Sequence, residues 1–124
     1  MKHLILALQT LTFTAPVAAA WVPFMKSDAS VVYIDSASVR KEGYRRKASV
    51  LVDMNQKDAD GVQSKRGQSE IDCQEVRMRI YDLSGFSGSM ASGEALYAFN
   101  GSSDWMPIPP NTALWNTIKF VCAR

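Results

Sequence analysis

The stretch that decides the fold is Ser69-Glu70-Ile71-Asp72-Cys73-Gln74-Glu75-Val76-Arg77-Met78-Arg79-Ile80-Tyr81, which carries one of the two cysteines in the 124-residue chain. From Val76 to Ile80, apolar residues alternate with arginines, and this alternation predicts a strand with one apolar face. We therefore interpret the whole stretch as the central strand of a sheet. Cys73 lies an even number of positions before Arg77, so in a continuous strand it would point to the same face as the arginines. A β-bulge near Gln74 or Glu75 would turn it toward the apolar face.

Residues 1–20 have the pattern of a signal peptide. Lys2 and His3 form a basic start, residues 4–17 are mostly apolar, and residues 18–20 are three alanines suited to cleavage. The apolar run is shorter than the roughly 20 residues that span a membrane. We expect export, cleavage after Ala20 and a mature domain over residues 21–124. No cysteine lies near the cleavage site, so no lipid anchor is expected, and the protein is periplasmic or secreted, with the cell surface as a third location.

The second cysteine, Cys122, lies close to the last residue. An exported chain with two distant cysteines most simply forms one disulfide, and two free thiols are the alternative. A Cys73–Cys122 bond would contribute about 4 kcal/mol in the chain-entropy model. We assign it a structural role, because it would hold the last segment against the middle of the sheet.

Composition limits the class of partner. Without Lys2 the chain has 13 basic and 12 acidic side chains, so no general attraction to nucleic acid is expected. Its length is sufficient for one domain with one modest core.

The rest of the chain divides into short extended segments and turns. We expect strands at 30–35, 44–54 and 94–99, a short apolar opening at 21–24, and extended backbone at 105–110, where prolines recur. A single helical turn is expected at 36–39. Residues 56–68 are polar and are expected to form a hairpin loop, and residues 82–93, rich in glycine and serine, a connection with little regular structure.

Residues 112–122 fit two structures. Leu114, Trp115, Ile118, Val121 and Cys122 share one helical face, and Asn111 or Thr112 can cap a helix after the prolines. The segment is also rich in β-branched residues, and Ile118, Phe120 and Cys122 alternate as in a strand. We favour the helix, with Trp115 buried beside Ile118, and the strand stays open.

Catalytic side chains are scarce. The only histidine, His3, belongs to the predicted signal peptide, so the mature chain lacks a histidine base, nucleophile or metal ligand. Residues 53–64 do not match a calcium loop, because position 6 is Asp58 and position 12 is Ser64. Glu70 and Asp72 are interpreted as solvated strand charges. We therefore expect no enzyme activity, no cofactor and no metal.

Arg45, Arg46, Lys65 and Arg66 form the densest basic groups of the mature chain and flank the expected hairpin loop. We take them as a candidate basic patch for acidic glycans or acidic protein segments. A solvated surface without a ligand is the alternative.

An ordered set of motifs resembles the bacterial surface-adhesin protein E family. It begins with Trp21, the run from Tyr33 to Arg40 and Gly43, and continues with Glu70-Ile71-Asp72-Cys73 and Arg77. Ser87-Gly88-Ser89-Met90, Trp105-Met106-Pro107-Ile108-Pro109-Pro110 and the segment from Trp115 to Cys122 complete it.

The resemblance implies an α+β fold, a single antiparallel sheet of about six strands with a C-terminal helix packed on one face and tied by the disulfide. It also implies adhesion to host extracellular-matrix or serum proteins, with a homodimer as a candidate assembly. The leading functional hypothesis is thus a non-enzymatic binding module of the bacterial envelope. The alternative is a periplasmic accessory or small-ligand-binding protein.

Overall fold

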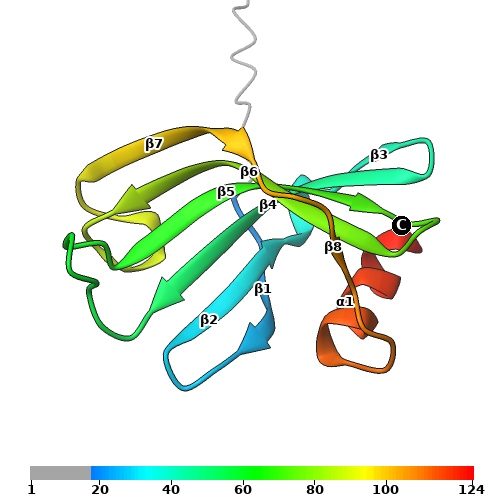
Figure 1. Cartoon of the computed structure of the whole chain (residues 1–124), viewed down its shortest axis with the longest axis horizontal. Coiled ribbons are helices and arrows are strands. Elements are labelled where there is room, and N and C mark those ends of the chain that lie inside the picture. Colours follow the sequence, from blue (N-terminus) through cyan, green and yellow to red (C-terminus); the bar gives the residue numbers. More distant parts are fainter. Residues whose placement is uncertain (1–17) are drawn as a thin grey trace, which may run out of the picture.

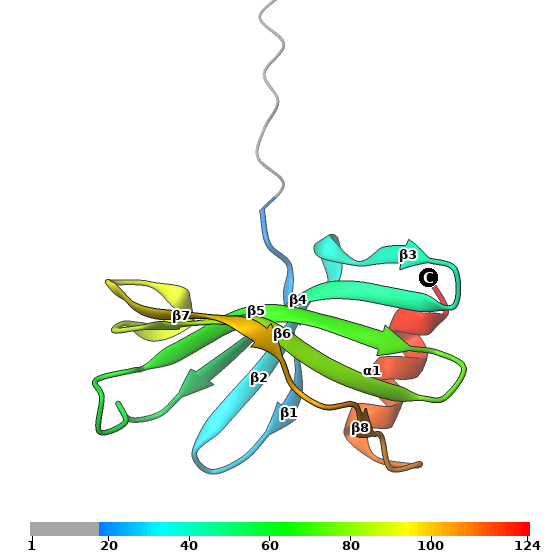
Figure 2. The same ribbon diagram turned by 45° about the horizontal axis from the view of Figure 1, so that its top comes forward.

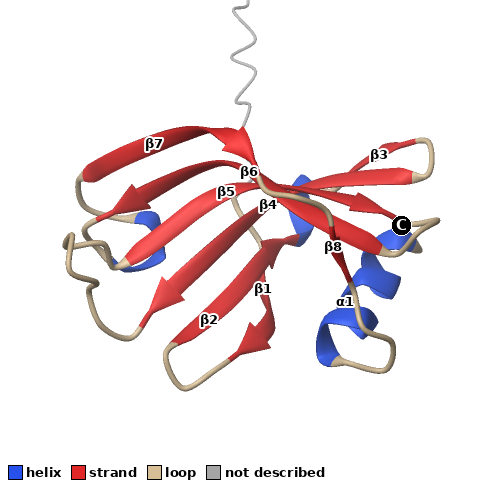
Figure 3. Ribbon diagram, in the orientation of Figure 1, coloured by secondary structure: helices blue, strands red, loops and turns tan. Residues whose placement is uncertain are grey.

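The computed structural model describes residues 18–124, so residues 1–17 of the predicted signal peptide lie outside the described part. Its elements (Figures 1 and 3) are, in chain order, β1 (Trp21–Lys26), β2 (Ser30–Asp35), the 3-10 turn η1 (Ser36–Ser38), β3 (Arg40–Glu42), β4 (Arg45–Met54), β5 (Ser64–Asp72), β6 (Arg77–Phe86), the 3-10 turn η2 (Ser89–Ala91), β7 (Ala95–Ser102), β8 (Met106–Pro107) and α1 (Ala113–Cys122).

All strand pairs in the described part are antiparallel and belong to one sheet. The order across the sheet is β1-β2-β4-β5-β6-β7, while β3 pairs with β4 and β8 pairs with β6. The six-stranded path and the C-terminal helix confirm the expected α+β fold. Figure 2 shows α1 on one side of the sheet, which we call the helix face; the opposite side is the outer face.

The central stretch is a hairpin and not one strand, so the predicted bulge is wrong. β5 ends at Asp72, and β6 begins at Arg77. The Asp72 carboxylate accepts hydrogen bonds from the backbone N–H groups of Gln74 and Glu75, both at 3.0 Å, which stabilises the turn. Val76 then takes a positive φ of 51°. Cys73 departs from the alternation of the arginines because the chain reverses direction between β5 and β6, and not because of a bulge.

β5 also begins earlier than the polar composition predicted. Residues 64–68 are part of it, so the loop after β4 covers only residues 55–63. β5 lies between β4 and β6, and both neighbours satisfy its backbone groups. Gly67 sits at a register shift, where an added Cβ would lie 3.0 Å from Leu83 Cδ1. β6 likewise continues to Phe86, so the first residues of the stretch 82–93, which was expected to have little regular structure, belong to a strand.

The last segment is a helix, as favoured. The Thr112 side chain accepts a hydrogen bond from Trp115 N–H at 3.1 Å and caps the first turn. Ile118 and Val121 are buried against the sheet, in one core with residues of β1, β2, β4, β5 and β6. Trp115 packs against this core but is only half-buried, so the prediction that it is buried beside Ile118 is wrong.

The disulfide confirms the predicted pairing. Cys73 and Cys122 are bonded, with Cα atoms 5.9 Å apart. The bond joins the β5–β6 turn to the last turn of α1 and holds the helix at one end of the sheet. No helix within residues 18–124 has the length and apolar character needed to cross a membrane.

Candidate functional site

A cluster of arginines surrounds one tryptophan on the outer face. Arg77 and Arg79 lie two residues apart on β6, so their side chains emerge on the same face. The Cζ atoms of both lie 4.5 Å from the centroid of the Trp105 ring, and that of Arg45 lies 5.7 Å from it. Guanidinium–indole contacts of this kind contribute about 0.5–1 kcal/mol each at exposed sites. We call these four residues the Trp105 cluster.

Two buried carboxylates hold the guanidinium groups in place. Glu70 accepts hydrogen bonds from Arg45 at 2.7 Å and Arg79 at 2.9 Å, and Asp72 accepts one from Arg77 at 3.1 Å. The expectation that Glu70 and Asp72 are solvated charges is therefore wrong, since both are buried. Register places them two apart on one strand, directly opposite arginines on β6.

The electrostatics of these carboxylates indicate structural ion pairs. Burial opposes ionisation of Glu70, but the hydrogen bond and charge of Arg79 and the charge of Arg45 outweigh it and lower its pKa. Burial likewise opposes ionisation of Asp72, and the backbone N–H of Glu75 and the side chain of Arg77 lower its pKa. A glycosidase acid needs a raised pKa, so this pair lacks the property that such catalysis requires.

Next to the Trp105 cluster lies a shallow polar hollow of about 370 Å³. It connects the cluster with the last residues of β7. Its walls combine two cations and two carboxylates with amide and hydroxyl groups, from Lys47, Glu70, Arg79, Tyr81, Asp82, Asn100, Gly101 and Ser102. This mixed lining can hydrogen-bond polar partner groups, but it has no strong net charge.

The four predicted patch residues are not brought together. Arg45 pairs with Asp72 at one end of β4, whereas Arg66 pairs with Leu51, six positions along the same strand. At about 3.4 Å per residue, this separates their backbones by roughly 20 Å. Arg66 instead stacks on Trp21, with 5.5 Å between its Cζ and the ring centroid.

Arg46 and Lys65 lie on the helix face. Arg46 is buried, with 5% of its surface exposed, and its guanidinium donates to the main-chain oxygens of Gly43, Cys122 and Arg124. It is thus unavailable to a surface ligand. Lys65 is half-buried on β5. A single patch does not exist, because neighbouring residues of a strand point to opposite faces; ligand binding by Arg45, Lys65 and Arg66 stays a prediction.

Sequence reasoning missed the Trp105 cluster. The Arg77-x-Arg79 spacing on a predicted strand was a signal that both side chains share a face. Nothing local indicates Trp105, which comes from the segment before β8 and reaches the arginines only through the pairing of β8 with β6.

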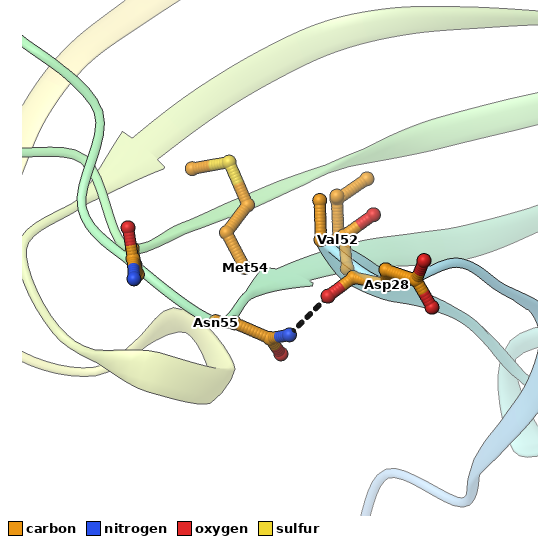
Figure 4. A pocket seen from close by; sticks show the side chains of 7 residues that line it. Asp28, Val52, Met54 and Asn55 are labelled. Carbon is orange, nitrogen blue, oxygen red and sulfur yellow. Dashed lines mark hydrogen bonds between the residues drawn. The ribbon is translucent and has the colours of Figure 1, made fainter.

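An apolar trough extends along the part of the helix face that α1 leaves uncovered. It consists of three hollows of about 460, 420 and 410 Å³. Val52 lines all three, and Ile80 and Met106 line two of them. Figure 4 shows the hollow at the β1–β2 turn, where Val52 and Met54 lie near Asp28 and the Asn55 amide donates to the Asp28 backbone carbonyl.

The two edges of the sheet differ. β1 contains Pro23, a register shift after it, and Lys26, all features that discourage further strand pairing. β7 has neither proline nor charge, and all its residues except Gly101 are exposed, including Phe99 with 60% of its surface accessible. β7 therefore presents an unprotected strand edge.

Comparisons with known proteins agree with this architecture. The family model described as surface-adhesin protein E matches residues 21–123. A structure of Haemophilus influenzae protein E aligns with a TM-score of 0.67 at 15% identity, covering 87% of each chain. A structure of protein E from non-typeable Haemophilus influenzae gives a TM-score of 0.65 at 15% identity, covering 87% of this chain and 80% of that one. Among curated proteins, none matches this sequence.

Proposed function

Because the chain belongs to the surface-adhesin protein E family, we propose that it is an exported, non-enzymatic binding module of the bacterial envelope that adheres to host matrix or serum proteins. Protein E of Haemophilus influenzae shares the fold at 15% identity, and this likeness assigns no binding role to any residue of this chain.

The observation that carries the proposal is the open edge of β7. An extended segment of a partner can add to such an edge as a further strand, with main-chain hydrogen bonds supplying affinity. Leu96, Tyr97 and Phe99 are exposed along it and offer apolar contacts to alternate side chains of that segment. The edge at β1 is protected against strand pairing, whereas the edge at β7 is not. Because an unprotected edge strand promotes aggregation, this difference supports a binding role for β7.

The polar hollow beside β7 adds a preference for partner chemistry. Lys47 and Arg79 line it together with Asn100 and Ser102 near the C-terminal end of β7. A segment paired with β7 would pass this hollow, where its polar groups can hydrogen-bond the amide, hydroxyl and charged side chains of both signs. Polar extended stretches of matrix or serum proteins are therefore the proposed ligands.

The test is surface-plasmon measurement on immobilised matrix and serum proteins with two matched variants. Leu96→Glu places a charge on β7, and Val22→Glu places the same charge on β1; the two wild-type side chains are 40% and 42% exposed. We expect Leu96→Glu to weaken binding about tenfold, a typical loss when an interface anchor is removed, and Val22→Glu to change it little. Equal effects of both variants, or no binding by the wild-type protein, would contradict the proposal.

A homodimer formed through β7 is the competing use of the same edge. Sedimentation of the wild-type protein and of Leu96→Glu separates the two. A dimer that dissociates in the variant would assign the edge to a second copy.

The apolar trough favours a second candidate function, a periplasmic small-ligand-binding protein. Pockets for small molecules are mostly apolar hollows of about 300–1,000 Å³. The three adjoining hollows on the helix face each fall in this range. Titration with aliphatic probes tests this function, and the absence of saturable binding would contradict it.

A further inference from the structure

The trough changes in polarity along its length. Beside α1 its lining carries no charged side chain and consists of Phe24, Met25, Val32, Val52, Met78, Ile80, Met106, Pro107, Ile108 and Leu114. The adjoining hollow, toward β7, keeps Val52, Ile80 and Met106 and adds Lys65 as its one charged lining residue. Between these two hollows the lining thus changes from purely apolar beside α1 to one that includes a cation toward β7, while the third hollow, at the β1–β2 turn, contains Asp28.

Lys65 has no anionic partner among the described residues. Each ion pair found in residues 18–124 uses Arg45, Lys47, Arg77 or Arg79. The side chain is half-buried on β5, opposite Val52 and Gly85. Its alkyl stem is suited to cover the apolar lining of this hollow while the ammonium stays hydrated, as is usual for half-buried lysines.

The floor of the trough discriminates between a peptide and an aliphatic chain. It is formed largely by β2, β4, β5 and β6, interior strands whose backbone groups are paired with their neighbours. A peptide laid on this floor would bury its own N–H and C=O groups without partners, at a cost of about 1–3 kcal/mol for each group. An aliphatic chain has no such groups.

The shape and lining also suit a chain. From Met78 to Leu83 on β6 the floor extends about 17 Å, at roughly 3.4 Å per residue. Met25, Met54 and Met106 contribute unbranched, flexible side chains to the walls, and such side chains adapt to irregular apolar ligands.

We propose that the trough on the helix face binds an amphiphile with an aliphatic chain and a carboxylate head, with the chain directed toward Leu114 and the head at Lys65. This inference rests on the second candidate function and names its ligand class. Its test does not require adhesion through β7, although Phe99 of β7 also lines the hollow that contains Lys65.

Three probes and two pairs of matched variants test the inference by calorimetric titration. The probes are dodecanoate, dodecyltrimethylammonium with a similar chain and a cationic head, and butanoate with a short chain, all below micelle-forming concentrations. Lys65→Met is matched by Arg66→Met, which removes the same charge from the opposite face of β5. Met106→Glu is matched by Met90→Glu, since the two methionines are 43% and 39% exposed and Met90 lies on η2, outside the trough.

We expect saturable binding of dodecanoate and weaker binding of both other probes. Lys65→Met should weaken dodecanoate binding about three- to tenfold, the range for a partly exposed charge pair, and remove the preference for the anionic head. Arg66→Met should change neither the affinity for dodecanoate nor the preference for the anionic head. Met106→Glu should weaken dodecanoate binding at least about tenfold more than Met90→Glu, because it places a carboxylate in the path of the chain.

Several results would overturn the inference. Equal affinity for dodecanoate and dodecyltrimethylammonium would leave a small-ligand protein but refute the carboxylate class. If neither long-chain probe bound saturably, both the small-ligand-binding function and the proposed amphiphile would be refuted. A wild-type dimer that Met106→Glu dissociates would assign the trough to a second copy of the chain.

Discussion

Replacing Arg46 distinguishes the structural interpretation from the sequence-based one more sharply than any other change. If Arg46 were part of a surface patch, its loss would slow association with a ligand and leave folding unchanged. In the structure its guanidinium makes four hydrogen bonds of 3.0–3.2 Å to main-chain oxygens, two of them at the end of α1, on Cys122 and Arg124. The last carbonyls of a helix have no partner within the helix, and Arg46 supplies one.

The expected loss follows from these contacts. Arg46→Met retains much of the apolar stem but leaves up to four main-chain oxygens without a donor. Carbonyls near the surface recover water, whereas each one that stays buried costs about 1–3 kcal/mol. We therefore expect Arg46→Met to lower the free energy of unfolding by about 2–4 kcal/mol. This is a large share of the roughly 5–15 kcal/mol that stabilises a typical domain.

Urea denaturation of the oxidised protein, followed by tryptophan fluorescence, measures this loss. Arg40→Met is the control, because Arg40 is exposed on β3, and exposed substitutions usually change stability by less than about 0.5 kcal/mol. Arg46→Lys keeps the charge but has fewer donors, so we expect an intermediate loss. A loss below about 1 kcal/mol for Arg46→Met with an unchanged m-value would refute the helix-end role.

Three further predictions concern stability. Replacing Cys73 and Cys122 by serine should cost about 4 kcal/mol for a bond that spans 49 positions; a denaturation midpoint equal to that of the oxidised wild type would contradict this. Ile118→Ala should cost about 2–5 kcal/mol in the same assay, because Ile118 is buried, whereas Phe120→Ala, on the exposed side of α1, should cost much less; equal losses would place the wrong side of α1 against the sheet. Asp72 has a lowered pKa in the folded state, so its stabilisation is present above the ordinary value of 3.8 and disappears as the pH falls through the folded value. Asp72→Asn should therefore lose most stability near neutral pH, and its deficit should shrink below pH 3.8 in acid titrations; a deficit that is constant across this range would rule out the ionic contribution.

Much of the fold could be predicted because the evidence for it is local. Alternation over residues 44–54, the cap and apolar stripe of residues 112–122 and the isolated cysteine pair each depend on neighbours in the sequence. The stretch around Cys73 was misread for the same reason, since a four-residue turn between two alternating strands has almost the same pattern as one strand with a bulge. Only the Asp72 carboxylate distinguishes them, and its role as a turn acceptor depends on which groups it meets.

The candidate sites were less predictable, because they consist of residues from distant segments. Basic residues adjacent in the sequence, such as Arg45 and Arg46, lie on opposite faces of β4 and have different roles. Trp105 joins the arginines of β4 and β6 only because β8 pairs at the edge of β6. No pattern of neighbouring residues in the sequence predicts contacts of this kind.

The sequence by itself indicated most of the strands, favoured the C-terminal helix and the disulfide, and pointed to the family, because period, capping and cysteine number are properties that the sequence records directly. The tertiary structure alone decided which charges are buried, which edge is open and where the helix face stays uncovered. The physical reason is that burial and pairing depend on what the folded chain brings opposite each side chain. Identical arginines thus become a helix-end donor at Arg46 and a guanidinium stacked on Trp105 at Arg77.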